Sequence, residues 1–125
     1  MKKILIVDDD PTILYAISVL MTSRDSLVTS CDTLEAAIKA LSQSVFDLVI
    51  TDVGLTGKDG LEGLVLLDHV REMSPLTAVI VVTGKGTDEI KEHACRQKAY
   101  YIEKSLEISH LLSIVKLHGI MIPEL

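Results

Sequence analysis

Short apolar runs alternate along the chain with longer segments in which apolar residues recur every three or four positions. The runs at residues 4–7, 46–51 and 77–83 are mostly apolar, with uninterrupted aliphatic centres, as expected of strands buried on both faces of a parallel sheet. Weaker runs at residues 26–31 and 99–103 predict two further strands. Helical spacing predicts a helix after each strand, the first beginning at Asp10-Pro11 and the others spanning residues 32–44, 61–73, 88–98 and 106–119.

Residues that commonly begin or end helices lie at the boundaries of these segments. Asp10 precedes a proline as an N-cap would, Asp32 or Thr33 caps the second helix, and Thr87 caps the fourth. Gly119 is a natural stop for the fifth helix. Five strand–helix units imply right-handed crossovers and a sheet covered on both faces. We therefore expect a flavodoxin-like α/β fold, a doubly wound parallel sheet with strand order 2-1-3-4-5.

Polar side chains stand at the carboxyl ends of four of the predicted strands. Asp8, Asp9 and Asp10 follow the first strand and Asp52 the third, Thr83 is the last residue of the fourth, and Lys104 follows the fifth. In such sheets ligands bind outside the carboxyl ends of the strands, near the switch point between strands 1 and 3. Two carboxylates about 5 Å apart repel each other by roughly 3 kcal/mol at an effective dielectric of 20, so the cluster predicts a cation. Hard oxygen ligands suit Mg²⁺, and the lysine and hydroxyl complete a site for a phosphoryl group.

Composition and charge narrow the class of protein. The 125 residues are 48% hydrophobic and only 3% aromatic, which predicts one domain with an aliphatic core. The net charge of −6 argues against direct binding of nucleic acid. No stretch approaches the roughly 18 apolar residues of a membrane span. Cys31 and Cys95 fit no metal spacing, and we interpret them as reduced, buried thiols of a cytoplasmic protein.

Four segments, "ILIVDDDP", "DLVITDVGLTGKDG", "VIVVTG" and "YYIEK", resemble the receiver domain of two-component response regulators. The resemblance covers essentially the whole chain. It implies a receiver domain over residues 1–119, followed at 120–125 by a tail or by the start of a linker to an output domain.

The resemblance implies a phosphoacceptor and a metal site. Asp52 matches the aspartate that accepts the phosphoryl group, and Asp8 and Asp9 match the acidic pair that holds Mg²⁺ or Mn²⁺. Of this pair, Asp9 is the expected direct ligand. Gly54 would offer its backbone carbonyl to the metal.

The resemblance also implies a switch and its partners. Lys104 matches the lysine that pairs with a phosphoryl oxygen, and Thr83 matches the residue whose hydroxyl hydrogen-bonds the phosphoryl group. Tyr101 matches the aromatic switch residue, whose rotamer changes with the position of the threonine. The donor would be a phosphohistidine on a sensor histidine kinase or a histidine phosphotransfer protein. The output would be a shift at the helix 4–strand 5–helix 5 face, and slow autodephosphorylation would replace the turnover of an enzyme.

Three departures from the family pattern concern the loops. Leu55-Thr56 stands in place of the usual Met-Pro, Ser105 in place of a cis-proline, and Lys98-Ala99 in place of Gly-Ala. The first change leaves a glycine-rich loop that we expect to be mobile without metal. Lys85 lies two residues after Thr83, beside the route of an attacking water, and we hypothesise that it alters the phosphoryl lifetime.

Two other functions compete with this interpretation. "DDDPT" also fits the D-x-D-x-T signature of haloacid-dehalogenase-type phosphatases, in which Asp8 would be the nucleophile and Asp10 the general acid. That family needs a further acidic pair, and only Asp88-Glu89, at the start of a predicted helix, is available. Asp52 would then be incidental, whereas a receiver requires it. The other rival is a degenerate receiver that acts only as a docking module.

The fifth predicted helix has more than one apolar side. One stripe contains Ile108, Leu111, Leu112 and Val115, whereas the remaining apolar residues, Leu106, Ile114 and Leu117, fall elsewhere around the helix. Such a helix buries its second side against something else. We therefore hypothesise a homodimer or partner contact there, with a tail packed on its own domain as the alternative.

Overall fold

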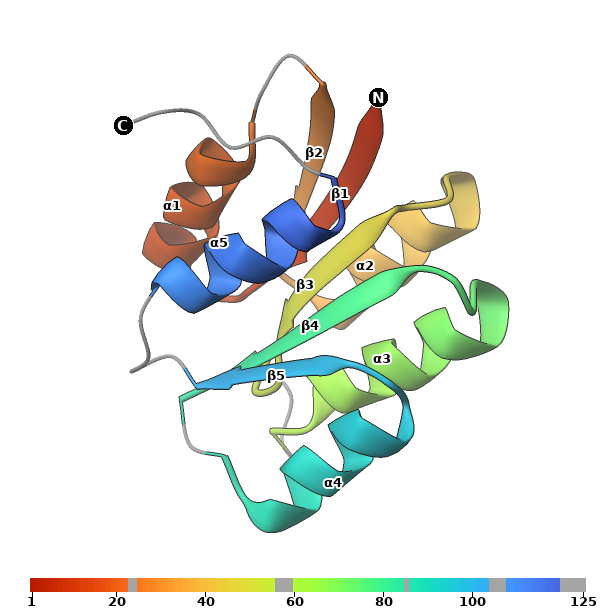
Figure 1. The fold of residues 1–125 in the computed structure, drawn as a ribbon. Helices are drawn as coiled ribbons and strands as arrows, with labels where there is room; N and C mark the ends of the chain where they lie inside the picture. The colour runs from red at the N-terminus through yellow and green to blue at the C-terminus, as the bar shows by residue number, and fades with distance from the viewer. Residues whose placement is uncertain (23–24, 56–59, 85, 104–107, 120–125) are drawn as a thin grey trace.

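The computed structural model describes residues 1–22, 25–55, 60–84, 86–103 and 108–119. It contains one parallel sheet whose strands are ordered β2-β1-β3-β4-β5 (Figure 1), which confirms the predicted flavodoxin-like topology. The strands are β1 (Lys2–Val7), β2 (Ser26–Cys31), β3 (Leu48–Asp52), β4 (Ala78–Thr83) and β5 (Tyr100–Glu103).

Helices cover both faces of the sheet. They are α1 (Pro11–Met21), α2 (Leu34–Gln43), α3 (Glu62–Met73), α4 (Asp88–Arg96) and α5 (Ile108–Leu117). In Figure 1, α1 and α5 lie on one face, and α2, α3 and α4 lie on the other. None of the helices in the described part of the chain is long and apolar enough to cross a membrane.

The two cores explain why the strands are apolar at every position. In β1, Ile4 and Ile6 pack in the core beneath α1 and α5, whereas Leu5 and Val7 pack in the core beneath α2, α3 and α4. Successive strand side chains point to opposite faces, so a sheet covered on both faces has no polar side. The continuous apolar runs therefore identified the central strands correctly.

The predicted helix caps are confirmed, with one choice resolved. Asp10 Oδ1 accepts hydrogen bonds from the backbone nitrogens of Thr12, at 2.9 Å, and Ile13, at 3.4 Å. Thr33 rather than Asp32 caps α2, and Thr87 caps α4. After α5 the chain turns at Gly119, which has a φ of +74°.

Helix α4 is shorter than predicted because the chain leaves the helix at Lys98, which has a φ of +57°. The backbone nitrogen of Lys98 bonds the carbonyl of Cys95 at 3.0 Å, and that of Ala99 bonds the carbonyl of Ala94 at 2.9 Å. This pair of bonds is a Schellman motif, which usually has glycine at the left-handed position.

Two predictions about individual side chains were wrong. Cys95 is exposed, because it lies on the outer face of α4, and only Cys31 is buried. Ile114 is buried beside Leu111 and Val115, because residues three and four apart share one face of a helix. Leu117 is 74% exposed. The described part of α5 therefore places most of its apolar side chains against its own sheet.

Candidate functional site

Three aspartates from two neighbouring strands meet at the carboxyl edge of the sheet. Val7 pairs with Thr51 across β1 and β3, so Asp8 and Asp9 follow β1 beside Asp52, the last residue of β3. One carboxylate oxygen from each of the three lies within 4.8 Å of the other two. Asp8 and Asp52 are buried and Asp9 is exposed. The predicted cluster is therefore formed, with one open side.

Asp10 lies outside this cluster and instead caps the start of α1. Its carboxylate caps α1, and its backbone nitrogen donates a 2.9 Å hydrogen bond to Asp8 Oδ1. The start of the helix thus orients the Asp8 carboxylate. The three consecutive aspartates are divided between two cluster members and one helix cap, as the sequence predicted for Asp10.

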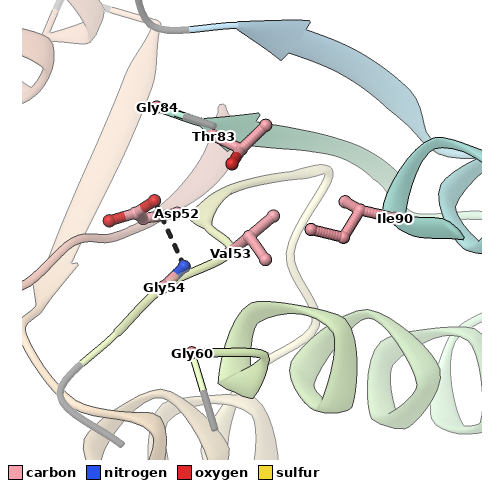
Figure 2. Close-up of a pocket in the computed structure, with 7 residues that line it drawn as sticks. All are labelled: Asp52, Val53, Gly54, Gly60, Thr83, Gly84 and Ile90. Carbon is pink, nitrogen blue, oxygen red and sulfur yellow. Dashed lines mark hydrogen bonds between the residues drawn. The ribbon is translucent and has the colours of Figure 1, made fainter. Parts of the chain in front are cut away.

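A cavity of about 310 Å³ opens beside Asp52 (Figure 2). Gly54 donates its backbone N–H to Asp52 Oδ1 at 3.4 Å. Thr83, at the end of β4, is buried and lines the same cavity. The side chains of Val53 and Ile90 point toward each other across it in Figure 2. The other lining residues are Gly60 and Gly84.

Gly63 is a contributor that the sequence analysis missed. A Cβ atom on Gly63 would overlap the Asp52 carbonyl oxygen and the Cα of Val53. The Gly63 nitrogen also donates a 2.9 Å hydrogen bond to the Val53 carbonyl. The first turn of α3 therefore packs directly on the backbone that carries Asp52. A glycine inside an otherwise amphipathic helix was the available signal.

Tyr101 lies on β5 near the start of α4. Its hydroxyl donates to Glu103 Oε1 at 3.4 Å and occupies the space that a Cβ atom on Gly86 would take. Burial, together with the negative charges of Glu103 and Asp88, raises the pKa of Tyr101. Tyr101 thus contacts the segment between Thr83 and α4. Lys85, Lys104, Ser105 and most of the predicted glycine-rich loop lie outside the described residues.

The sequence model of the family described as "Response regulator receiver domain" matches residues 4–116. This chain belongs to that family. The receiver domain is a phosphorylation-activated signalling switch of two-component systems, as the resemblance implied, and no finding supports the phosphatase alternative.

Curated relatives are longer than this receiver domain. The response regulator protein FleR of Pseudomonas aeruginosa is 33% identical over 119 residues, which are 94% of this chain and 24% of FleR. A putative NtrX-like response regulator of Rickettsia felis is 32% identical over 114 residues, covering 90% of this chain and 24% of that protein. The chain thus spans about a quarter of the length of these relatives.

Solved receiver domains have the same fold. A CheY-like receiver domain protein from Methanospirillum hungatei superimposes with a TM-score of 0.84 at 28% identity, covering 94% of this chain and 92% of that one. The BeF3-activated DrrB receiver domain gives a TM-score of 0.81 at 28% identity, with coverages of 95% and 97%.

Proposed function

We propose that Asp52 is the phosphoacceptor of this receiver domain and that Asp8, Asp9 and Asp52 hold Mg²⁺ beside it. The meeting of these three carboxylates within 4.8 Å is the observation that carries the proposal. The donor set fits the metal, because hard carboxylate oxygens with one open side suit a cation that keeps several waters. Mn²⁺ would use the same ligands, and the Gly54 carbonyl is the proposed backbone ligand. When bound, the metal neutralises negative charge on the phosphoryl oxygens.

In the proposed reaction, an Asp52 carboxylate oxygen attacks the phosphorus of a phosphohistidine. A P–O bond forms, the P–N bond breaks, and the imidazole leaves with the electron pair of that bond. Thr83 lies at the same cavity and supplies a hydroxyl to the transferred group. Lys104, which follows β5 in the sequence, supplies a positive charge. The chain's own contribution is thus position and electrostatics, with slow autodephosphorylation and no turnover of substrate.

We further propose that the donor is a sensor histidine kinase or a histidine phosphotransfer protein in the cytoplasm. Thr83 and Tyr101 would pass the change to the α4–β5–α5 face, where a homodimer or an output domain would respond. The packing of Tyr101 against Gly86 supports this route because it joins β5 to the segment that leads into α4. The net charge of −6 argues against direct contact between this domain and nucleic acid. Residues 1–119 would form the domain, and residues 120–125 a tail or linker.

Incubation with a small phosphodonor and Mg²⁺, read by intact mass, tests the proposal. We expect one phosphoryl adduct that disappears in Asp52→Ala and when EDTA removes the metal. Asp47→Ala is the matched control, because this exposed aspartate lies immediately before the opposite end of β3. An adduct that survives Asp52→Ala but is lost in Asp8→Ala would overturn the proposal in favour of the phosphatase.

A further inference from the structure

Helices α3 and α4 are joined by a polar cluster outside the cavity of the proposed phosphoryl site. Asp68 of α3 accepts two hydrogen bonds on one carboxylate oxygen, from His93 Nε2 and from Gln97 Nε2, each at 2.7 Å. His93 and Gln97 are four residues apart, so the two side chains lie on the same side of α4, one in its second half and one at its C-cap. The Asp68 carboxylate thus binds the second half of α4 at two points.

Arg71, one turn after Asp68 on α3, holds the turn that follows α4. Its Nε donates to the Gln97 carbonyl at 2.6 Å, and Nη2 donates to the Lys98 carbonyl at 3.4 Å. Nη1 donates to the Thr77 carbonyl at 2.7 Å, just before β4. A single guanidinium therefore ties α3 to both the end of α4 and the start of β4.

The position of Arg71 suits a cation. The last carbonyls of α4 form the negative end of the helix dipole, and the Gln97 and Lys98 carbonyls that Arg71 bonds come directly after them. Burial lowers the pKa of Arg71 below its ordinary value, although an arginine remains protonated at neutral pH. The C-terminal end of α4 is thus held by the half-buried, positively charged guanidinium of Arg71, whose planar group fixes the directions of its N–H donors.

The opposite end of α4 has a different environment. Thr87, Asp88 and Glu89 are exposed, and the first buried side chain of the helix is that of Ile90, which lines the cavity beside Asp52. Within the described part of α4 and the turn after it, the bonds from Asp68 and Arg71 reach His93, Gln97 and Lys98, which all lie in the second half of the helix or beyond it. One end of the helix therefore lies at the proposed phosphoryl site, and the other is anchored to α3.

We infer that Asp68, Arg71, His93 and Gln97 form a clamp that fixes the C-terminal end of α4, so that phosphorylation moves the first turn of α4 about this anchored end. The inference rests on the proposed function for its trigger. It requires the two ends of α4 to respond differently to the same phosphoryl group. Weakening the clamp would then spread the response along the whole helix.

Amide hydrogen exchange of the full chain, with and without a small phosphodonor and Mg²⁺, tests the clamp. In the wild-type chain we expect altered exchange at residues 86–91 and unchanged exchange at residues 95–99. The amides of Gln97, Lys98 and Ala99 are direct probes, because each donates a hydrogen bond in the anchored turn. In Arg71→Gln and Asp68→Asn their exchange should quicken by about tenfold without phosphodonor, and the phosphodonor response should extend through residues 95–99.

Glu72→Gln is the matched control, because Glu72 is the exposed neighbour of Arg71 on the same helix and lies outside the clamp. It should exchange as the wild-type chain does. The clamp is overturned if phosphorylation alters all of α4 in the wild-type chain, or if Arg71→Gln and Asp68→Asn keep wild-type protection at Gln97 to Ala99. If intact mass shows no adduct, the proposed function fails, while the exchange rates without phosphodonor still decide whether the clamp exists. If Arg71→Gln does not fold, Arg71→Lys replaces it in this test. Lysine keeps the positive charge but lacks the planar guanidinium donors, so exchange at Gln97 to Ala99 should be faster than in the wild-type chain but less than tenfold faster.

Discussion

The Tyr101 hydroxyl lies against the backbone of Gly86, in the space that a Cβ atom on this glycine would occupy. The same space is 3.4 Å from the methyl carbon of Thr83. Gly86 therefore lets the aromatic ring approach the segment between Thr83 and α4. The proposed aromatic switch, Tyr101, can thus take this position only because residue 86 is a glycine and has no side chain.

Gly86→Ala should displace the Tyr101 ring, because the new methyl group and the hydroxyl cannot share one position. The chain has three tyrosines and no tryptophan, so fluorotyrosine labelling and ¹⁹F NMR give a signal for each ring. We expect the Tyr101 signal, assigned with Tyr101→Phe, to shift while those of Tyr15 and Tyr100 stay in place.

Gly54→Ala is the matched control for this experiment. A Cβ atom on Gly54 would meet only the Gly60 carbonyl oxygen, at an ordinary 3.7 Å. It should leave the Tyr101 signal unchanged. The same Tyr101 signal in Gly86→Ala and in the wild-type chain would show that the ring does not occupy this seat in solution.

Gly63→Ala should destabilise the domain by about 1–3 kcal/mol, because its methyl group would overlap backbone atoms of Asp52 and Val53 rather than a flexible side chain. Urea unfolding followed by circular dichroism measures this change. Gly54→Ala, which introduces no such overlap, should cost much less. Equal losses in the two variants would contradict close packing of α3 on β3.

Lys98→Gly should stabilise the domain by about 1 kcal/mol, because glycine adopts a φ of +57° without the strain that a Cβ atom causes. The midpoint of urea unfolding should rise. Lys91→Gly removes the same side chain from the exposed interior of α4 and should instead cost about 1 kcal/mol. If Lys98→Gly destabilises as Lys91→Gly does, the turn after α4 is not left-handed in solution.

The fold could be predicted from the sequence because each of its signals is local. A strand buried on both faces needs apolar residues at every position, as Leu48 to Ile50 show. A helix begins where a side-chain oxygen can bond free backbone nitrogens, as at Asp10 and Thr87. The strand order then follows from the few topologies that right-handed crossovers allow.

The aspartate cluster could be predicted from the topology, because parallel strands bring their carboxyl ends to one edge of the sheet and the strand order places Asp8 and Asp9 beside Asp52. The contacts that were missed join segments distant in sequence. Nothing local in Arg71 indicates that its donors reach Gln97 and Thr77, and nothing in Gly63 names the carbonyl against which it packs. The exposure of Cys95 depends on which side of α4 faces α3, which the sequence pattern left open.

Mg²⁺ should stabilise the domain through Asp9 and not through Asp10. Without metal, Asp9→Asn removes one of three like charges and should raise stability by on the order of 1 kcal/mol. In the wild-type chain, Mg²⁺ at about 100 times its Kd should add about 2.7 kcal/mol. Thermal unfolding with and without Mg²⁺ measures both effects.

Asp10→Asn is the control, because asparagine also caps helices and Asp10 lies outside the cluster. An equal loss of the Mg²⁺ effect in Asp9→Asn and Asp10→Asn would count against the assigned ligands.

The two cysteines should react at very different rates, because only Cys95 is exposed. Burial raises the pKa of Cys31 above its ordinary value, and the negative charge of Asp32 raises it further, so little of the reactive thiolate forms at neutral pH. A colorimetric disulfide reagent should label one thiol of the native chain quickly and the second, Cys31, far more slowly. Cys95→Ser should remove the fast phase of labelling, and Cys31→Ser should remove the slow phase.

Labelling of Cys31 should keep accelerating with pH beyond the ordinary thiol pKa, because its thiolate fraction is still rising there. A fast phase that survives Cys95→Ser would mean that β2 opens at its Cys31 end faster than the reagent reacts.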